Sequence, residues 1–343
     1  MAATFGEKVK VTVFGQSHSE AIGCVVDGIP AGLSLDMDAI ETLMNRRRPG
    51  SANSQADSRT ITARRETDQS HIVSGVVEGV TCGAPICAII ENKDQRSKDY
   101  SQFKACPRPS HSDYPAFLKY GRDYHDIRGG GQFSGRMTAP LCFAGAVCMQ
   151  YLAQFGVSVQ AKLVRVGGET DPEKFNSVIR EAASRGDSVG GVIACTVEGF
   201  PGGIGDPIYG ALESRLSAVL FAVPAVKGVE FGDGFSLSDA YGSQVNDLYT
   251  MDEAGRVVTK TNHNGGILGG ISTGMPITLR VAFKPTPSIA MPQTTLDLDK
   301  QCEVEQVIGG RHDPCVAVRA VPVVESAVSC VLADYMVQYK GGK

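Results

Sequence analysis

The sequence predicts an α+β protein that contains an internal duplication of a strand-turn-helix-strand unit. Three observations lead to this prediction. Short runs rich in β-branched residues occur together with longer helical patterns, and two pairs of segments recur with similar glycine and proline spacing. No low-complexity linker divides the chain. We therefore expect a single body over residues 1–343, made of two interlocked related halves at about 10–160 and 190–335.

The strands are expected where short runs are rich in β-branched residues. These runs cover residues 8–15, 21–28, 85–91, 191–199, 276–283 and 315–324. Helical patterns cover residues 36–47, 138–155, 171–186, 207–221 and 322–339. Asp36 offers an N-cap for the first helix, and the second is apolar almost all round, which predicts a buried helix.

The duplication is predicted from two echoes. "VVDGIPAGLSLDMDAIETLMNRR", from Val25, is similar to "TVEGFPGGIGDPIYGALESRLSAVL", from Thr196. "GVTCGAPICAII", from Gly79, is similar to "GISTGMPITLRV", from Gly270. A chance recurrence of glycine-rich turns is the alternative, but a duplication accounts for both pairs in the same order.

Composition limits the classes of function. The net charge of −4 argues against a nucleic-acid binder held by bulk charge. The ten cysteines form no C-x-x-C pair, which is typical of free thiols in a reducing cytoplasm. The N-terminus lacks the apolar core of a signal peptide, and we expect no membrane-spanning run. We therefore expect a cytoplasmic protein with no nucleic-acid or membrane partner.

Residues 128–138, "RGGGQFSGRMT", place three glycines between two arginines. Glycines let a backbone approach a ligand closely, and arginines bind phosphate or carboxylate, so the stretch is interpreted as an anion-binding loop. A flexible surface turn is the alternative.

Histidines and cations gather in other loops too. His18, His111, His263 and His312 lie in loops rich in Gly, Ser or Pro. The cations of this set are Arg46, Arg47, Arg48, Arg59, Arg64, Arg65, Arg108, Arg128, Arg136, Lys284 and Arg311. For Arg46 to Arg48, stabilisation of a helix C-terminus is the alternative. The whole set predicts a ligand with several negative charges, with histidines placed to move protons.

Two classes of function fit these features: an enzyme that acts on a small polyanion, and a binding module without chemistry. Several histidines in such loops favour the enzyme. A P-loop kinase is disfavoured because no G-x-x-x-x-G-K-[ST] is present, and a Rossmann oxidoreductase because no G-x-G-x-x-G follows the first strand.

The motifs together resemble the chorismate synthase family. The matching stretches, in chain order, are "FGQSHS", "VDGIPAG", "RRRPG", "RRETDQ", "IENKDQRS", "RPSHSDY", "RGGG", "AVKGVEFGDGF", "NHNGGILGGISTG", "KPTPSI" and "GRHDPCVAVRAVP". The resemblance implies a β-α-β sandwich, a homotetramer, and a lyase that eliminates phosphate from 5-enolpyruvylshikimate 3-phosphate to give chorismate. It also implies a requirement for reduced FMN (FMNH2) without net redox change, and no metal.

The resemblance assigns roles by position. His18 corresponds to the histidine that protonates the departing phosphate, His111 to the one that protonates the reduced flavin, and Asp313 to the carboxylate that removes the ring hydrogen with the flavin. Substrate-binding positions fall on Arg47, Arg59, Arg108, Arg136 and Arg311. Flavin-binding positions fall on Ser134, Ala225, Gly269, Lys284, Pro285, Thr286, Pro287, Ser288 and Arg311. Arg47 and Arg59 also lie where a nicotinamide cofactor (NADP) is assigned in some members.

The chain departs from the family pattern near the flavin. Many members read Arg-Ser-Ser-Ala-Arg after the glycines, where residues 132–136 read Gln-Phe-Ser-Gly-Arg. Gln16 and Ser19 replace the usual Glu and Gly, and Pro224 replaces a frequent Asn. FMN binding is therefore expected to rest on Lys284 to Ser288 and Arg311. A diverged paralogue that binds flavin or an anionic phosphometabolite without full turnover is the alternative. With no reductase module in view, external reduction of FMN is favoured over direct use of NADPH.

Overall fold

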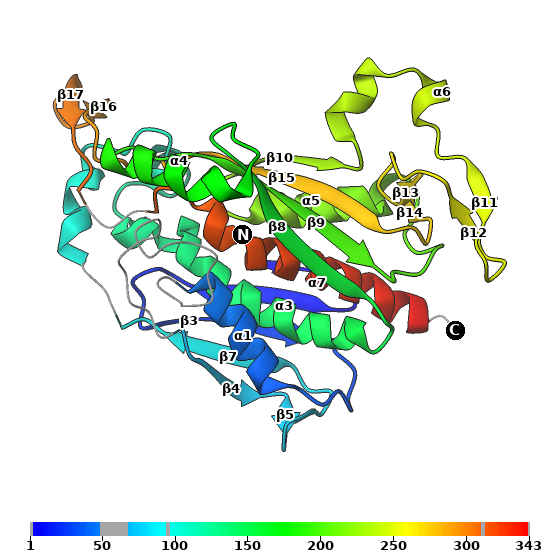
Figure 1. Cartoon of the computed structure of the whole chain (residues 1–343). Coiled ribbons are helices and arrows are strands. Elements are labelled where there is room, and N and C mark those ends of the chain that lie inside the picture. Colours follow the sequence, from blue (N-terminus) through cyan, green and yellow to red (C-terminus); the bar gives the residue numbers. More distant parts are fainter. Residues whose placement is uncertain (1–2, 49–67, 94–96, 310–312, 342–343) are drawn as a thin grey trace.

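The computed structural model describes residues 3–48, 68–93, 97–309 and 313–341, and shows two antiparallel sheets with a layer of helices between them (Figure 1). The first sheet has the order β1 (Thr4–Phe5), β2 (Lys10–Gly15), β3 (Ala21–Asp27), β7 (Ile86–Glu91) and β4 (Ser70–Ser74). The second has the order β10 (Val226–Phe231), β15 (Ile277–Phe283), β9 (Gly191–Glu198) and β8 (Ser158–Val166). The predicted β-α-β sandwich is confirmed.

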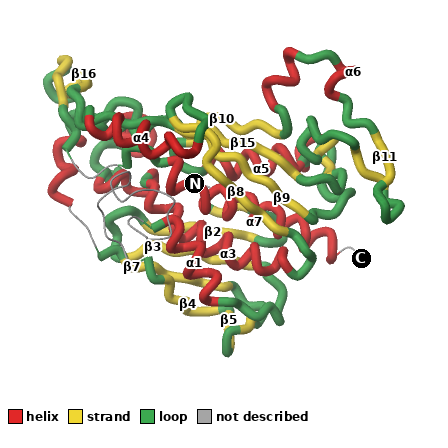
Figure 2. The backbone as a smooth tube through the Cα atoms, in the orientation of Figure 1, coloured by secondary structure: helices red, strands yellow, loops and turns green. Residues whose placement is uncertain are grey.

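The helices between the sheets are α1 (Met37–Arg47), α3 (Thr138–Ala153), α5 (Leu212–Ala222) and α7 (Ala317–Gly341). Figure 2 shows α4 (Pro172–Ser184) on the outer side of the second sheet. The remaining helices are α2 (Asp113–Tyr120), α6 (Gly242–Val245), η1 (Ser97–Lys104), η2 (Arg128–Phe133), η3 (Gly135–Met137), η4 (Ile208–Gly210) and η5 (Gly234–Asp239). Four small ribbons complete the fold: β5 (Val76–Val77) with β6 (Val80–Thr81), β11 (Tyr249–Met251) with β12 (Val257–Thr259), β13 (Ile267–Leu268) with β14 (Ile271–Ser272), and β16 (Gln293–Asp297) with β17 (Cys302–Gln306).

The two sheets share one connectivity. In the first, the order β2-β3-β7-β4 is followed along the chain by α3, and in the second the order β8-β9-β15-β10 is followed by α7. β3 leads through a glycine-proline turn into α1, just as β9 leads into α5. The repeated unit that the sequence predicts therefore recurs in space with the same strand order. The boundaries of the two halves stay a prediction.

One buried hydroxyl fixes this turn in each copy. In the first copy Thr81 Oγ1 donates to the carbonyl of Pro30 (2.7 Å) and accepts from the amide of Leu33 (3.0 Å). In the second, Ser272 Oγ donates to the carbonyl of Pro201 (2.6 Å) and accepts from the amide of Ile204 (3.0 Å). Each hydroxyl satisfies two backbone groups of a turn that enters a core, where an unsatisfied group would be costly.

The core centres on α3 and α7, which cross in the middle of the sandwich. The stretch Ala317–Tyr339 of α7 is long and apolar enough to cross a membrane by length and composition, which corrects the expectation that no run reaches that length. However, 89% of its most apolar window is buried inside the protein. α7 is therefore the core helix of the sandwich, and its apolar surface is covered by other elements rather than by lipid.

The strand predicted at 315–324 is wrong, because most of this run forms the first turns of α7. The run is apolar at every position except Arg319, and a short apolar run of this kind does not separate strand from helix. Pro322 is accommodated within the helix. The helix expected at 207–221 begins later, at Leu212, after the short η4. The other helices lie within a few residues of their predicted bounds, and Asp36 caps α1 as expected, through a 2.9 Å bond from the amide of Ala39.

A buried carboxylate ties the N-terminus to α7. Asp334 is 0% exposed and accepts from the amides of Lys8 (2.6 Å) and Val9 (2.8 Å). Arg215 of α5 donates to the same carboxylate at 2.6 Å. This carboxylate and its partners join the segment between β1 and β2 to α5 and α7.

The crossing of α3 and α7 depends on Gly145. A Cβ at this position would lie 2.2 Å from the Cβ of Ser326. We expect Gly145→Ala to force the helices apart and to lower the free energy of unfolding by about 1–3 kcal/mol, measured by urea denaturation. Gly242→Ala is the matched control, because the nearest atom would be 4.0 Å away. An equal effect of both changes would contradict the close approach at the crossing.

Candidate functional site

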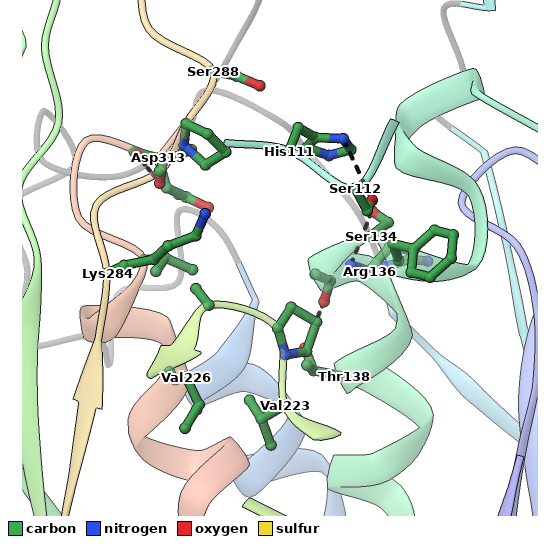
Figure 3. Close-up of a pocket in the computed structure, with 18 of the residues that line it drawn as sticks. His111, Ser112, Ser134, Arg136, Thr138, Val223, Val226, Lys284, Ser288 and Asp313 are labelled. Carbon is green, nitrogen blue, oxygen red and sulfur yellow. Dashed lines mark hydrogen bonds between the residues drawn. The ribbon is translucent and has the colours of Figure 1, made fainter. Parts of the chain in front are cut away.

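A cavity of about 530 Å³ opens at one end of the helical layer. Its walls come from segments far apart in the sequence, which Figure 3 shows converging: the loop before α2, the η2–η3 segment, the turn between α5 and β10, the loop after β15, and the start of α7. One part of the lining is apolar and includes Val223, Pro224, Ala225, Val226 and Val323. Most of the rest of the lining is polar and includes six cations.

The charges around the cavity do not balance. Among the described residues, the cations that line it are Arg47, Arg108, Arg136, Lys227, Lys284 and Arg319, and the lining carboxylate is Asp313. Asp68 and Asp113 pair with lining arginines from behind the wall. Cations thus exceed these carboxylates by three. A ligand with several negative charges would restore the balance.

Two of the arginines share one buried carboxylate. Asp68 is 1% exposed, and it accepts from Arg47 Nη1 (2.7 Å) and from Arg136 Nη1. Arg47 also donates through Nε to Thr138 Oγ1 (3.1 Å) and through Nη2 to the carbonyl of Gly135 (3.0 Å). Burial raises the pKa of Asp68, but the two guanidiniums outweigh it and hold the pKa below its ordinary value.

His111 and Arg108 are held by a second buried carboxylate. Asp113 is 0% exposed, accepts from Arg108 Nε and Nη2 (2.8 Å each), and lies 2.7 Å from His111 Nδ1. Burial raises the pKa of Asp113, but the hydrogen bonds from Arg108 and His111 hold it well below its ordinary value. Burial, together with the charges of Arg108 and Lys284, lowers the pKa of His111. His111 is therefore mainly neutral near pH 7. Its Nδ1 lies 2.7 Å from Asp113 Oδ1 and 3.1 Å from Arg108 Nη2, and the shorter contact with the carboxylate favours the tautomer that carries the proton on Nδ1 and leaves Nε2 as an acceptor.

The three glycines let the backbone pass between His111 and the loop that carries His18. All three adopt positive φ, at 59°, 85° and 53°. A Cβ at Gly129 would lie 2.5 Å from Ser17 Oγ and 3.1 Å from His18 Cε1, and one at Gly130 would lie 3.4 Å from His111 Nε2. The run is therefore a close-packed wall and not a flexible turn. Its first arginine, Arg128, pairs with Asp126 (2.8 Å) and does not line the cavity.

His18 lies behind this wall. Its side chain is buried, it is not among the lining residues, and its ring meets the ring of Tyr100 edge to face at 5.2 Å between centroids. Gly129, which does line the cavity, lies directly against the ring. The backbone of Gly129 therefore separates the ring of His18 from the cavity, and it does so without a side chain.

The second half of the chain supplies the other polar groups. Asp313 Oδ2 accepts from Arg319 Nη1 at 2.6 Å, and Arg319 Nε donates to the carbonyl of Arg47 (3.1 Å). Lys284 Nζ donates to the carbonyl of Ser110 at 2.6 Å, next to His111. Figure 3 shows Lys284 and Asp313 on one side of the cavity and His111, Ser134 and Arg136 on the other.

The cavity gathers most of the predicted site residues. Those that line it are Arg47, Arg108, His111, Ser134, Arg136, Ala225, Lys284, Thr286, Pro287, Ser288 and Asp313. Pro285 adjoins them in the chain but does not itself line the cavity, and Gly269 lies elsewhere, in the turn between β13 and β14. Arg59, Arg64, Arg65, Arg311 and His312 fall outside the described residues. His263 bonds to Asp233 (2.6 Å) near the start of η5 and does not line the cavity.

The sequence analysis missed Arg319, Asp68 and Asp113. All three lie within stretches already quoted for the family resemblance, "GRHDPCVAVRAVP", "RRETDQ" and "RPSHSDY". Arg319 was hidden in a run assigned to a strand. The two aspartates were overlooked because a search for an anion-binding site favours cations, although buried cations need carboxylate partners.

The fold and the cavity define an α+β protein with a cationic cavity suited to a small polyanion and with His111 on its wall. The family model described as chorismate synthase matches residues 9–337. The chain is 44% identical to the chorismate synthase of Methanothermobacter thermautotrophicus, over 97% of this chain and 93% of that one. It is 45% identical to that of Granulibacter bethesdensis, over 98% and 97%. A crystal structure of chorismate synthase superposes with a TM-score of 0.76 at 26% identity, covering 98% of this chain and 94% of that one.

The chain belongs to the chorismate synthase family, as the sequence motifs predict. The activity of this family is a lyase reaction of the shikimate pathway, on the route to aromatic amino acids. It is the 1,4-trans elimination of phosphate from 5-enolpyruvylshikimate 3-phosphate to give chorismate, with reduced FMN and no net redox change. The predicted activity is confirmed at this level.

The charge of Asp113 should stabilise the fold in a pH-dependent way. Its pKa is lowered in the folded state, so its stabilisation is present above the unfolded-state pKa of about 4 and is lost as the pH falls below that value. We expect Asp113→Asn to lower the free energy of unfolding by about 3 kcal/mol or more at pH 7, and by clearly less at pH 2.5, well below the unfolded-state pKa, in urea titrations. Asp123→Asn, whose side chain is 83% exposed, is the control and should have little effect at either pH. A loss of the same size at both pH values would show that the charge is not its origin.

Proposed function

We propose that the cationic cavity is the active site for this elimination, and that 5-enolpyruvylshikimate 3-phosphate and FMN bind in it together. The observation that carries the proposal is the surplus of cations on a wall that also presents His111. The substrate has one phosphate and two carboxylates, and FMN adds a further phosphate. Cations positioned in advance stabilise the charge that develops on the departing phosphate.

The residues present fit a flavin. Its ring system requires an apolar surface, which Val223 to Val226 and Val323 provide, and its polar edge and phosphate require donors, which Lys284 and Ser288 provide. The volume of about 530 Å³ lies within the range usual for small-molecule sites. Gln132 and Phe133 also line the cavity, so the contacts of this chain with the flavin differ from the usual family pattern at these two positions. Reduced FMN, when bound, supplies electron density to the substrate as phosphate leaves.

His111 is proposed to deliver its proton through Nε2. Its neutral form is favoured in the unliganded protein, because burial and neighbouring cations lower its pKa. An anionic flavin beside Nε2 would reverse this effect and raise the pKa, while Asp113 holds Nδ1 in place. His111 would then protonate the reduced flavin.

Asp313 and His18 complete the proposed acid–base set. Asp313 is fixed by Arg319 and is proposed to act with the flavin in removing the ring hydrogen of the substrate. From the resemblance, His18 is proposed to protonate the departing phosphate, which requires Gly129 to move or a water molecule to bridge the two, because the Gly129 backbone separates the His18 ring from the cavity. Arg47, Arg108 and Arg136 would hold the anionic groups of the substrate. The assignments of Arg59 and Arg311, and of NADP to Arg47 and Arg59, remain predictions from the resemblance.

The proposed assembly is a homotetramer in the cytoplasm. Residues 233–260, which carry η5, α6, β11 and β12, extend away from the body of the sandwich (Figure 1). This segment exposes Phe235 (81%), Tyr241 (78%) and Met251 (70%), and exposed apolar side chains of this size favour a protein interface. Gly269 lies outside the cavity of its own chain, so a flavin contact at this position would be made to a neighbouring subunit.

An anaerobic assay tests the activity. The purified protein is incubated with 5-enolpyruvylshikimate 3-phosphate and chemically reduced FMN, and chorismate and phosphate are followed. We expect turnover with reduced FMN. We expect none with oxidised FMN and NADPH, because the sequence favours reduction of FMN by a separate reductase over direct use of NADPH. Binding of FMN without turnover would support the diverged paralogue instead. Failure to bind FMN even with substrate present would contradict the proposed cofactor site.

A histidine variant tests the mechanism. We expect His111→Ala to lower turnover by about 100-fold or more, because it removes an acid–base group at the cavity. His71→Ala is the matched control, since His71 is exposed on β4, an edge strand of the first sheet. Unchanged turnover in His111→Ala would remove this residue from the mechanism.

A further inference from the structure

Asp68 stands out among the buried groups near the cavity because it serves two arginines at once. Its side chain is 0% exposed, and those of Arg47 and Arg136 are 4% exposed each. Both arginines line the cavity, whereas Asp68 does not. The carboxylate therefore lies behind the two guanidiniums, on the side away from the ligand.

The remaining contacts of the two arginines also come from the protein side. Arg136 Nε donates to Asn92 Oδ1 (2.9 Å) and its Nη2 approaches the carbonyl of Glu91 (3.4 Å). Arg47 is held by Thr138 and by the carbonyl of Gly135. Each planar guanidinium is thus fixed by several acceptors, and Asp68 contacts both of them. Two like charges brought together in a buried wall repel each other unless a carboxylate lies between them.

A purely structural role would leave Asp68 comparable to other buried carboxylates of the fold. Asp334 also pairs with an arginine, at 2.6 Å, and Glu325 pairs with Arg46 at 2.7 Å. Neither carboxylate lines the cavity, and neither do their partners, Arg215 and Arg46. Asp68 differs from these two carboxylates because both of its partners line the cavity, and it differs from Asp113 because both partners are arginines. Asp68 also does not occupy the place of a ligand anion, since it is covered by its partners.

We infer that Asp68 is a positioning residue, which sets the directions of Arg47 and Arg136 so that both guanidiniums present their cavity-facing edges to one anionic ligand. This inference rests on the proposed active site. Asp68 touches neither the ligand nor the reacting atoms, and it acts through the two arginines. Asp68 fixes the directions of the two guanidiniums, and its own negative charge lowers the net positive charge of the wall.

A positioning role predicts opposite effects of Asp68→Asn on the affinity for an anion and on the turnover rate. Replacing Asp68 by Asn removes one negative charge behind the wall, so the attraction of the wall for an anion should rise. The amide has only one acceptor oxygen, and its NH2 group would face a donor of the second arginine. One guanidinium would then turn away, and small misplacements of positioning groups are costly to the rate.

The test uses Asp68→Asn in the full-length protein, with reduced FMN. We expect kcat to fall by about tenfold or more, with KM for 5-enolpyruvylshikimate 3-phosphate unchanged or lower. In the absence of FMN and substrate, inorganic phosphate should bind at least about threefold more tightly, measured by calorimetry. Asp334→Asn is the matched control: it should lower Tm and leave kcat, KM and phosphate affinity unchanged.

Clear outcomes would overturn the inference. An unchanged kcat in folded Asp68→Asn, or a raised KM with weaker phosphate binding, would show that Asp68 does not position the arginines. If Asp68→Asn does not fold, Asp68→Glu keeps the charge and moves the carboxylate by one methylene. It should bind phosphate as the wild type does, with kcat at least about threefold lower, and a wild-type kcat would overturn the claim. Phosphate affinity is measured without turnover, so a wild-type protein that fails to form chorismate would contradict the proposed function and leave this test intact.

Discussion

The structure depends on keeping arginines out of water without losing their charge. Arg47, Arg108 and Arg136 are nearly fully buried, and each has a carboxylate within hydrogen-bond distance. Burying an unpaired charge would cost several kcal/mol, so the aspartates decide which directions the guanidiniums take. Because of this pairing, the arginines of the cavity point in fixed directions, so the cavity selects an anion by the placement of its charges as well as by attraction.

The sandwich brings these pairs together because its two halves meet at the cavity. Arg319 of α7 donates to the carbonyl of Arg47 at the end of α1, and Lys284 after β15 donates to the carbonyl of Ser110. Each bond joins the second half to the first. The cavity is therefore a product of the packing of two copies of one unit, while the copies themselves are fixed by equivalent turns at Thr81 and Ser272.

Much of this could be predicted from the sequence, for physical reasons that differ between elements. The strands next to the glycine-proline turns were found because turn residues and β-branched runs act locally. The run at 315–324 forms a helix instead of the predicted strand because a short run that is apolar at nearly every position carries no period that distinguishes the two. The cations of the site were visible as residue types, but their partners were not, since the pairing of Asp68 with both Arg47 and Arg136 is set by tertiary packing. The position of His18 behind Gly129 is also set by tertiary packing, so local sequence patterns do not predict it.

The bond between Lys284 and the carbonyl of Ser110 bears on which molecules the cavity can accept. The ammonium group already has a good neutral acceptor in the unliganded protein, and burial lowers its pKa. An uncharged molecule could offer only another neutral acceptor, so the exchange would gain it almost nothing. A phosphate or carboxylate adds a full negative charge, which attracts the ammonium group more strongly than a neutral carbonyl does. The resting contact thus acts as a threshold that favours anions and discriminates against neutral metabolites of similar shape.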